Sequence, residues 1–338
     1  MERRRGALLA SNLLDLLREE DRARLYELGR ARVVERGEEV VRQGTLGDCL
    51  FVVEEGELAV VRALPGDAER VLITARPGML LGELAVLDGA PRSASLRAVR
   101  RSVLRVIGLG AFEALVLHGG EPGHRILRAV ATLVHDRLEA TRRVAARDTG
   151  AACGTSGCGA PLAWSAPGPA VAGVLGVLPA FAGLHRPDLE AMLTGIRVAE
   201  LARGTELLLP ESLDPGVIMV LRGALSPWLA DGSGPEATLP AIGPGGFVDY
   251  AAALGIANEP RTWRVRSPTR LMRLDPALFE PAAPWSARLL RLDAALFEQQ
   301  NPFAARLLYA LSRSLATALR RTTGLAMHFR MAWVRGNA

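Results

Sequence analysis

The chain has 338 residues, of which 49% are hydrophobic and 23% are charged. This composition suits a soluble protein of one or two domains, and the longest apolar stretch is too short and too rich in glycine and proline to cross a bilayer. All 41 basic residues are arginines, scattered among 36 acidic ones, so the net charge of +5 does not favour a nucleic-acid partner. We therefore expect a cytoplasmic protein without a membrane or nucleic-acid partner.

The first part of the chain predicts one complete α+β domain over residues 12–146. Residues 12–30 carry leucines at helical spacing and predict an opening helix. From Ala31 to Gly108, short runs rich in valine and leucine alternate with glycine-containing corners, as in a roll or barrel of antiparallel strands. Helical periodicity returns after Gly110 and predicts a pair of closing helices.

Two short motifs within this strand region indicate a ligand site. Gly-Glu-Leu-Ala occupies residues 82–85, and Pro-Arg-Ser occupies residues 91–93. A carboxylate accepts hydrogen bonds from a sugar hydroxyl, and an arginine presents a fork of donors to phosphate oxygens. Small residues around them let the backbone approach a ligand closely. Ribose and phosphate in one small pocket are typical of a nucleotide.

The stretch GELAVLDGAPRSAS (residues 82–95) resembles the phosphate-binding cassette of cyclic nucleotide-binding domains, found in catabolite-activator-type regulators, kinase regulatory subunits and cyclic-nucleotide-gated channels. The resemblance implies that Glu83 bonds the ribose 2′-hydroxyl and that Arg92 pairs with the exocyclic phosphate. It also implies backbone contacts at residues 84–85 and a base contact from the closing helix. The implied binding residues are Gly82, Glu83, Leu84, Ala85, Arg92, Ser93 and Thr141.

The rest of the chain predicts a linker and a second copy of the domain. Residues 147–177 are rich in Ala, Gly, Ser and Pro, which is typical of a linker. From residue 178 to 325 the corner glycines and strand runs of the first domain recur. For example, the second copy has Pro244-Gly245-Gly246-Phe247 where the first has Pro77-Gly78-Met79-Leu80. The expected fold is α+β, with two cyclic nucleotide-binding β-rolls (jelly-roll-like antiparallel barrels), each flanked by an opening helix and closing helices.

The second copy departs from the family pattern, so we expect it to be degenerate. Its Gly-Glu pair is replaced around Asp249, and Arg261 and Thr262 follow after a gap two residues longer, which gives at most a weak second site. Residues 270–287 and 288–305 match at eleven of eighteen positions, which predicts a local duplication. The helical pattern of residues 303–319 suits the domain core or a homodimer contact, and residues 326–338 are expected to form a C-terminal tail.

These features predict a receptor for cAMP or cGMP that acts as a regulatory or adaptor protein, through a protein partner that the sequence does not identify or through self-assembly. The cyclic nucleotide is its ligand; no other cofactor is expected. The alternative is a structural scaffold that keeps the β-rolls without ligand control. The histidines and the cysteines Cys49, Cys153 and Cys158 lack metal-ligand spacing, and motifs of hydrolases and nucleotide triphosphatases are missing. We therefore expect neither a metal nor an enzyme.

Overall fold

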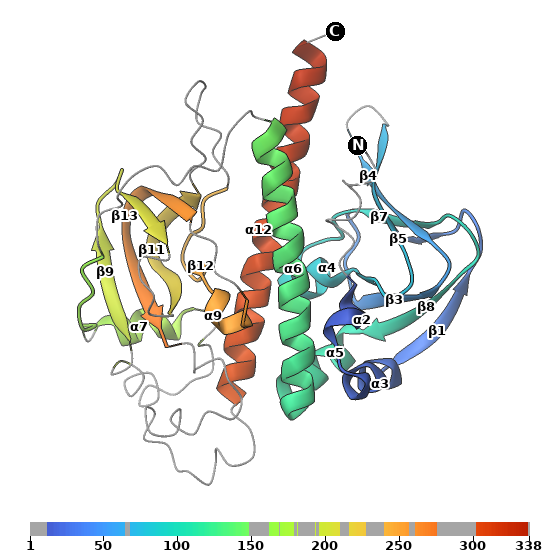
Figure 1. Ribbon diagram of the computed structural model, residues 1–338, viewed down its shortest axis with the longest axis horizontal. Helices are drawn as coiled ribbons and strands as arrows, with labels where there is room; N and C mark the ends of the chain where they lie inside the picture. The colour runs from blue at the N-terminus through green and yellow to red at the C-terminus, as the bar shows by residue number, and fades with distance from the viewer. Residues whose placement is uncertain are drawn as a thin grey trace. The chain divides into compact units, whose positions relative to one another are not determined.

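The computed structural model describes residues 12–64, 68–148, 162–168, 170–178, 181, 193, 196–209, 216–227, 240–256, 261–275 and 302–336. The chain divides into two compact units, Met1–Ala140 and Thr141–Ala338, whose elements are labelled in Figure 1. The division falls within the helix Gly120–Asp148. It lies six residues before the end of the first domain predicted from composition, at residue 146. Across the described residues, no helix is both long and apolar enough to span a membrane.

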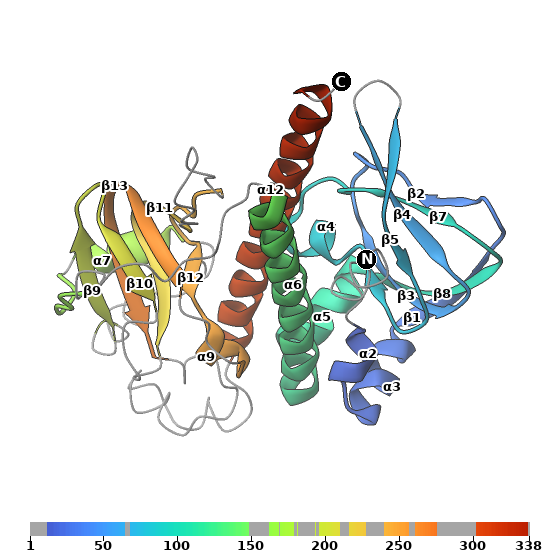
Figure 2. The same ribbon diagram turned by 45° about the horizontal axis from the view of Figure 1, so that its top comes forward.

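The first unit contains two four-stranded antiparallel sheets that form a β-roll, as Figure 2 shows. One sheet has the order β1 (Gly29–Val34), β8 (Ser102–Gly108), β3 (Cys49–Glu55) and β6 (Leu80–Leu81). The other has the order β2 (Glu39–Val41), β7 (Ser95–Ala98), β4 (Leu58–Ala63) and β5 (Glu69–Ala75). The predicted α+β fold with antiparallel strands and flanking helices is confirmed, although the strands form two sheets and not one closed barrel.

Side chains from both sheets share one hydrophobic core, which includes Val34, Phe51, Leu58 and Leu104. The corner between β3 and β4 depends on Gly56, whose φ of 90° is left-handed. A Cβ at this position would lie 2.1 Å from the hydroxyl of Ser102. The glycine therefore lets the chain turn from one sheet into the other.

Short helices precede the roll and longer ones follow it. In place of one opening helix, the structure has α2 (Leu13–Leu16) and α3 (Glu19–Glu27), because Leu17 and Arg18 take extended backbone angles between them. The closing helices are α5 (Leu109–His118) and α6 (Gly120–Asp148). A further short helix, α4 (Glu83–Asp88), lies between β6 and β7.

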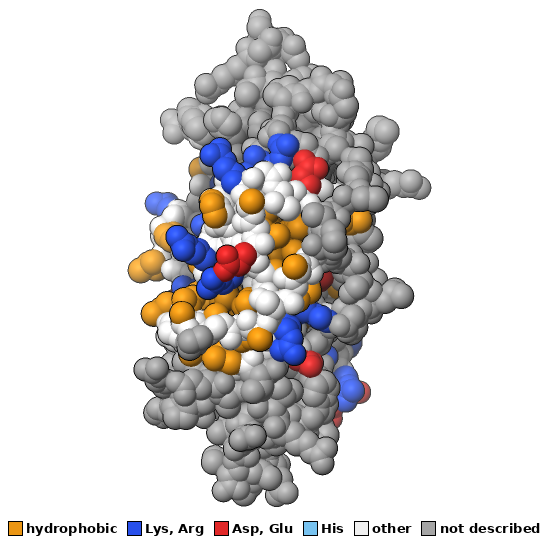
Figure 3. Space-filling view, turned by 90° about the vertical axis from the view of Figure 1, so that its left-hand side faces the viewer, with side chains coloured by type: hydrophobic (Ala, Val, Ile, Leu, Met, Phe, Trp, Pro, Cys, Tyr) orange, Lys and Arg blue, Asp and Glu red, His pale blue; other side chains and the backbone are white. Residues whose placement is uncertain are grey.

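The second unit contains a five-stranded antiparallel sheet with long, bent strands. Its path is β10 (Glu206–Leu209), β13 (Arg261–Leu274), β11 (Val217–Pro227) and β12 (Phe247–Asp249), and β9 (Arg197–Leu201) also pairs with β13. Its described helices are α7 (Ala170–Gly176), α9 (Ala251–Leu254) and α12 (Pro302–Gly336). On the face of this unit shown in Figure 3, hydrophobic side chains lie among arginines.

The two units pair their strands in the same order and register. A residue in the sheet of the second unit has a number 167 higher than its counterpart in the first unit. Val34 pairs with Ser102 in the first unit, and Leu201 pairs with Thr269 in the second. In the same way, Leu58 pairs with Ala98, and Leu225 pairs with Val265. The glycine corners agree, because Gly78 donates to the Val53 carbonyl as Gly245 donates to that of Val220, both at 2.8 Å. The segment between Gly78 and Ala98 therefore has the same length in both units.

Two boundaries differ from those predicted. Part of the expected linker packs into the second unit, because Val171 and Leu175 of α7 are buried and Ser165 pairs with Val198. The expected tail is also wrong in part: α12 continues to Gly336, in keeping with a sequence that has no proline after Pro302. Residues 270–274 of the duplication belong to β13, and its residues 276–301 lie outside the described part, as does most of the second opening helix.

Candidate functional site

The Gly-Glu-Leu-Ala run forms a sharp turn from strand β6 into helix α4. Gly82 caps this helix with a left-handed φ of 83°. A Cβ on Gly82 would lie 2.4 Å from Nη1 of Arg92, so a side chain is excluded by both conformation and space. Gly47 approaches from another loop, where a Cβ would lie 2.6 Å from Cβ of Ala85. These glycines leave room for the arginine beside the helix.

Arg92 is a buried cation, with 4% of its surface exposed. Its own backbone fixes the loop between α4 and β7: its N–H donates to the Thr45 carbonyl at 2.8 Å, and its carbonyl accepts from Gly44 at 2.9 Å. The guanidinium donates to the carbonyl of Gly82 at 3.1 Å and to that of Cys49 at 2.8 Å.

The acceptors of the Arg92 guanidinium are neutral. No described carboxylate forms an ion pair with Arg92, and its Nε has no hydrogen-bond partner among the described residues. The thiol of Cys49 lies 3.5 Å from Nη2, and burial raises the pKa of this thiol, which keeps it uncharged. Because an unpaired buried charge is costly, this arrangement suits an anionic ligand.

Glu83 holds the closing helix against α4. Its carboxylate is 4% exposed and accepts a bond of 2.5 Å from the guanidinium of Arg137, which is 7% exposed and belongs to α6. Arg137 also donates to the carbonyl of Leu80 at 2.9 Å. Arg137 was not among the residues predicted from the sequence, because an arginine in an amphipathic helix of an arginine-rich chain carries no local signal.

The other predicted residues are placed as follows. Ala85 is buried within α4, whereas Leu84 and Ser93 are partly exposed. Thr141 belongs to α6, one turn beyond Arg137, and is the first residue of the second compact unit. The structure thus brings Gly82, Ala85 and Arg92 together and adds Arg137 to the site at Glu83. The role of Thr141 stays a prediction.

The register of the second unit corrects the proposed counterpart of Glu83. Asp249 belongs to strand β12 and pairs with Ile218, as Leu81 of the first unit pairs with Phe51. The position of Glu83 falls on Tyr250 by the register offset, or on Ala251 by the start of the short helix. In neither case does it fall on Asp249, and neither residue is a carboxylate.

The counterpart of Arg92 is also different from the one predicted. In the second unit Pro227 pairs with Trp263, as Val60 pairs with Leu96 in the first. Counted from these pairs, Arg261 and Thr262 correspond to residues 94–95 of the first unit. They belong to β13, where they pair with residues 208–209 of β10. Counted along this register, the position of Arg92 is taken by Glu259, which lies outside the described residues. The predicted equivalence failed because it matched the Pro-Arg dipeptides and accepted a gap that the strand pairing does not contain.

Comparisons with known proteins agree with the fold of the first unit. Residues 31–118 match the family model of the cyclic nucleotide-binding domain, so this segment is such a domain. An ABC transporter ATP-binding protein of Mycobacterium tuberculosis is 44% identical over 78 residues, which are 23% of this chain and 23% of that protein. The Cyclic AMP receptor protein of Thermus thermophilus is 35% identical over 85 residues, 25% of this chain and 39% of that one.

A solved structure is also similar to part of the chain. The Catabolite Activator Protein of Thermus thermophilus is 27% identical, with 41% of this chain and 67% of that one covered and a TM-score of 0.37. The matched segment spans about a quarter of the length of the first curated relatives, 23%.

Proposed function

We propose that the first unit binds cAMP or cGMP and that the chain is a regulatory or adaptor receptor for this ligand. The observation that carries the proposal is Arg92, a cation with 4% exposure that has no carboxylate partner among the described residues. The phosphate of a cyclic nucleotide supplies the missing negative charge. Its oxygens replace the neutral carbonyls of Gly82 and Cys49, and an arginine–phosphate pair can form two parallel N–H···O bonds between opposite charges.

In this proposal, Glu83 and Arg137 connect the ligand to the closing helix. The ribose 2′-hydroxyl donates to the carboxylate of Glu83, and this carboxylate already accepts from Arg137 of α6. A ligand that changes the Glu83–Arg137 contact changes the stability of α6 against α4. Such a differential contact is what a ligand needs to shift the population of two arrangements. The proposed output passes from α6 to a protein partner or to a second copy of the chain.

The relatives support the ligand class, and the register supports a division of labour between the units. A relative named Cyclic AMP receptor protein matches this chain over 85 residues. We propose that residues 12–146 form the competent domain. The second unit is then a degenerate domain that has kept the strand order but not the charged pair.

Thermal unfolding with and without nucleotide tests this function. At a ligand concentration of about a hundred times Kd, binding to the folded state alone adds about 2.7 kcal/mol to its stability. We expect cAMP or cGMP to raise the Tm of the wild-type chain and to leave that of Arg92→Ala unchanged. Arg76→Ala is the matched control, because Arg76 is exposed in a loop of the same unit.

Arg92→Lys separates recognition from folding, because it keeps the buried charge but loses the guanidinium fork. We expect it to fold and to bind the nucleotide more weakly than the wild type. A well-folded wild-type chain whose Tm responds to neither nucleotide would contradict the receptor and favour the scaffold. A response that survives in Arg92→Ala would show that the ligand does not use this pocket.

A further inference from the structure

The second unit contains a cavity that is unrelated to its altered cassette. It has a volume of about 370 Å³ and lies between helix α12 and the turn formed by residues 240–246. This turn leads directly into β12, and both β12 and α12 are labelled in Figure 1. This volume falls within the range of sites for small molecules. Asp249, Arg261 and Thr262 do not line this cavity, so it is separate from the weak site predicted from the sequence.

The charged residues of this cavity are all arginines. Arg142, Arg313 and Arg321 line it, and no aspartate or glutamate does. Arg313 and Arg321 are exposed, and neither forms an ion pair with a described residue. Together with Thr317 they recur every four residues on α12, which places them along one face of the helix. On the side of α12, the described part of the cavity therefore has a positive wall formed by Arg313 and Arg321.

The opposite wall is a glycine-rich turn with apolar neighbours. It contains Gly243, Gly245 and Gly246 between Ile242 and Phe247. Gly245 has a left-handed φ of 79°, and a Cβ on Gly246 would lie 2.3 Å from a methyl group of Ile242. The turn therefore depends on glycine, and its main chain borders the cavity without side chains that would fill it.

We propose that this cavity binds a small phosphorylated molecule. Guanidinium groups match phosphate oxygens in charge and in geometry, and several of them on one wall favour a ligand with more than one phosphate charge. The apolar residues Pro240, Ile242 and Ala310 offer a surface for the uncharged part of such a ligand. The second unit would then sense a phosphorylated ligand of its own, independently of the cyclic nucleotide of the first unit.

Calorimetric titration of the full chain with pyrophosphate at low ionic strength tests this proposal. The test variant is Arg313→Gln combined with Arg321→Gln, which changes two exposed residues and leaves the fold intact. The matched control is Arg306→Gln, an exposed arginine of the same helix outside the cavity. Arg92→Ala reports on the pocket of the first unit.

We expect the wild type, Arg306→Gln and Arg92→Ala to bind pyrophosphate with similar affinity. The double variant should bind at least about tenfold more weakly, since two charge-assisted contacts are lost. The proposal is overturned if the wild type does not bind, if the double variant binds as well as the wild type, or if Arg306→Gln weakens binding equally. Loss of binding in Arg92→Ala alone would place pyrophosphate in the first unit and also overturn it. None of these results depends on whether a cyclic nucleotide binds.

Discussion

His124 is a buried histidine that is uncharged at neutral pH in the folded protein. It lies in α6 with 3% of its surface exposed, and Nδ1 has no hydrogen-bond partner among the described residues. The guanidinium of Arg128 lies 3.2 Å from Nε2, and because arginine can only donate, Nε2 is the acceptor. Burial, and to a lesser extent the charge of Arg128, lowers the pKa of His124 from 6.5 to about 4.

This shift predicts that the first unit loses stability as the pH falls from about 6.5 to about 4. In that window the unfolded chain binds a proton that the folded chain refuses, so protonation favours unfolding. The contribution of His124 to the free energy of unfolding between pH 7 and pH 4.5 is about 2–3 kcal/mol. Urea unfolding at the two pH values measures it.

The matched variants are His124→Gln and His118→Gln, since His118 is exposed at the end of α5. His124→Gln should reduce the loss of stability between pH 7 and pH 4.5, whatever its effect at pH 7. His118→Gln should leave that loss unchanged. Equal pH dependence in the wild type and in His124→Gln would contradict the assignment.

At the level of residues, the sequence predicted the local parts of the site but not the distant one. Glu83 and Arg92 stand in one motif of fourteen residues, which can be recognised in the sequence. Its first glycine, Gly82, is needed because a side chain there would collide with Arg92. Arg137 meets Glu83 from a helix that begins after the whole β-roll. Its role follows from how α6 packs, and no spacing rule within one element predicts such a contact.

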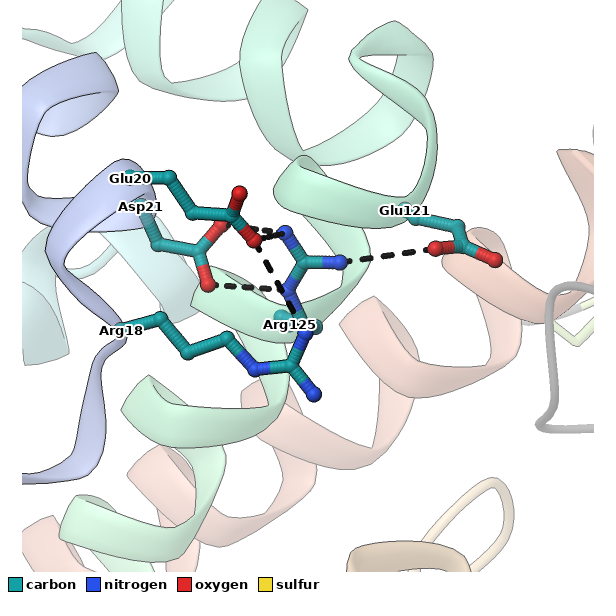
Figure 4. A network of polar contacts seen from close by, with 5 residues as sticks. All are labelled: Arg18, Glu20, Asp21, Glu121 and Arg125. Atoms are coloured by element: carbon teal, nitrogen blue, oxygen red, sulfur yellow. Dashed lines mark hydrogen bonds and ion pairs between the residues drawn. The ribbon is translucent and has the colours of Figure 1, made fainter.

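At the level of elements, a charged cluster fastens the first helices to the closing helix. Figure 4 shows Arg125 of α6 between Asp21 and Glu20 of α3 and Glu121 of its own helix. Arg125 makes two bonds to Asp21, of 2.8 Å from Nε and 2.7 Å from Nη2, and one of 2.8 Å to Glu20. The side chain of Asp21 is 1% exposed, whereas that of Glu20 is 65% exposed.

We expect this difference in exposure to decide how much each acid contributes. Asp21→Ala leaves the partly buried guanidinium without its two-bond partner and should lower the free energy of unfolding by about 3 kcal/mol. Glu20→Ala removes an exposed pair with the same arginine and should cost less than about 1 kcal/mol. Urea unfolding of both variants measures these values, and equal losses would contradict this account of the cluster.

Element boundaries were predicted well where composition reflects packing and poorly where it does not. The strands between glycine corners were found, because short runs rich in valine and leucine stand between turns that need glycine. The linker was drawn too long, because small residues such as those of α7 resemble a flexible segment until their partners are known. The helix α12 was drawn too short, because its apolar stripe was followed only to residue 319.

At the level of the whole molecule, two copies of one strand order differ in sequence at the positions of the charged pair. The register shows equal lengths between the corner at Gly78 and strand β7, and between Gly245 and the matching part of β13. Within those equal segments, the first unit has Glu83 and Arg92, while the second has an uncharged residue and Glu259. The second unit therefore lacks the pair of residue types on which the predicted phosphate and ribose contacts depend.

The chain should therefore bind a single cyclic nucleotide, in its first unit. Calorimetric titration with the nucleotide that stabilises the protein should give one site per chain. Arg92→Ala should abolish this binding, and Arg261→Ala should leave both affinity and stoichiometry unchanged, because Arg261 belongs to the strand ladder and not to the cassette loop. Two sites per chain, or weaker binding in Arg261→Ala, would contradict the prediction that only the first unit binds the nucleotide.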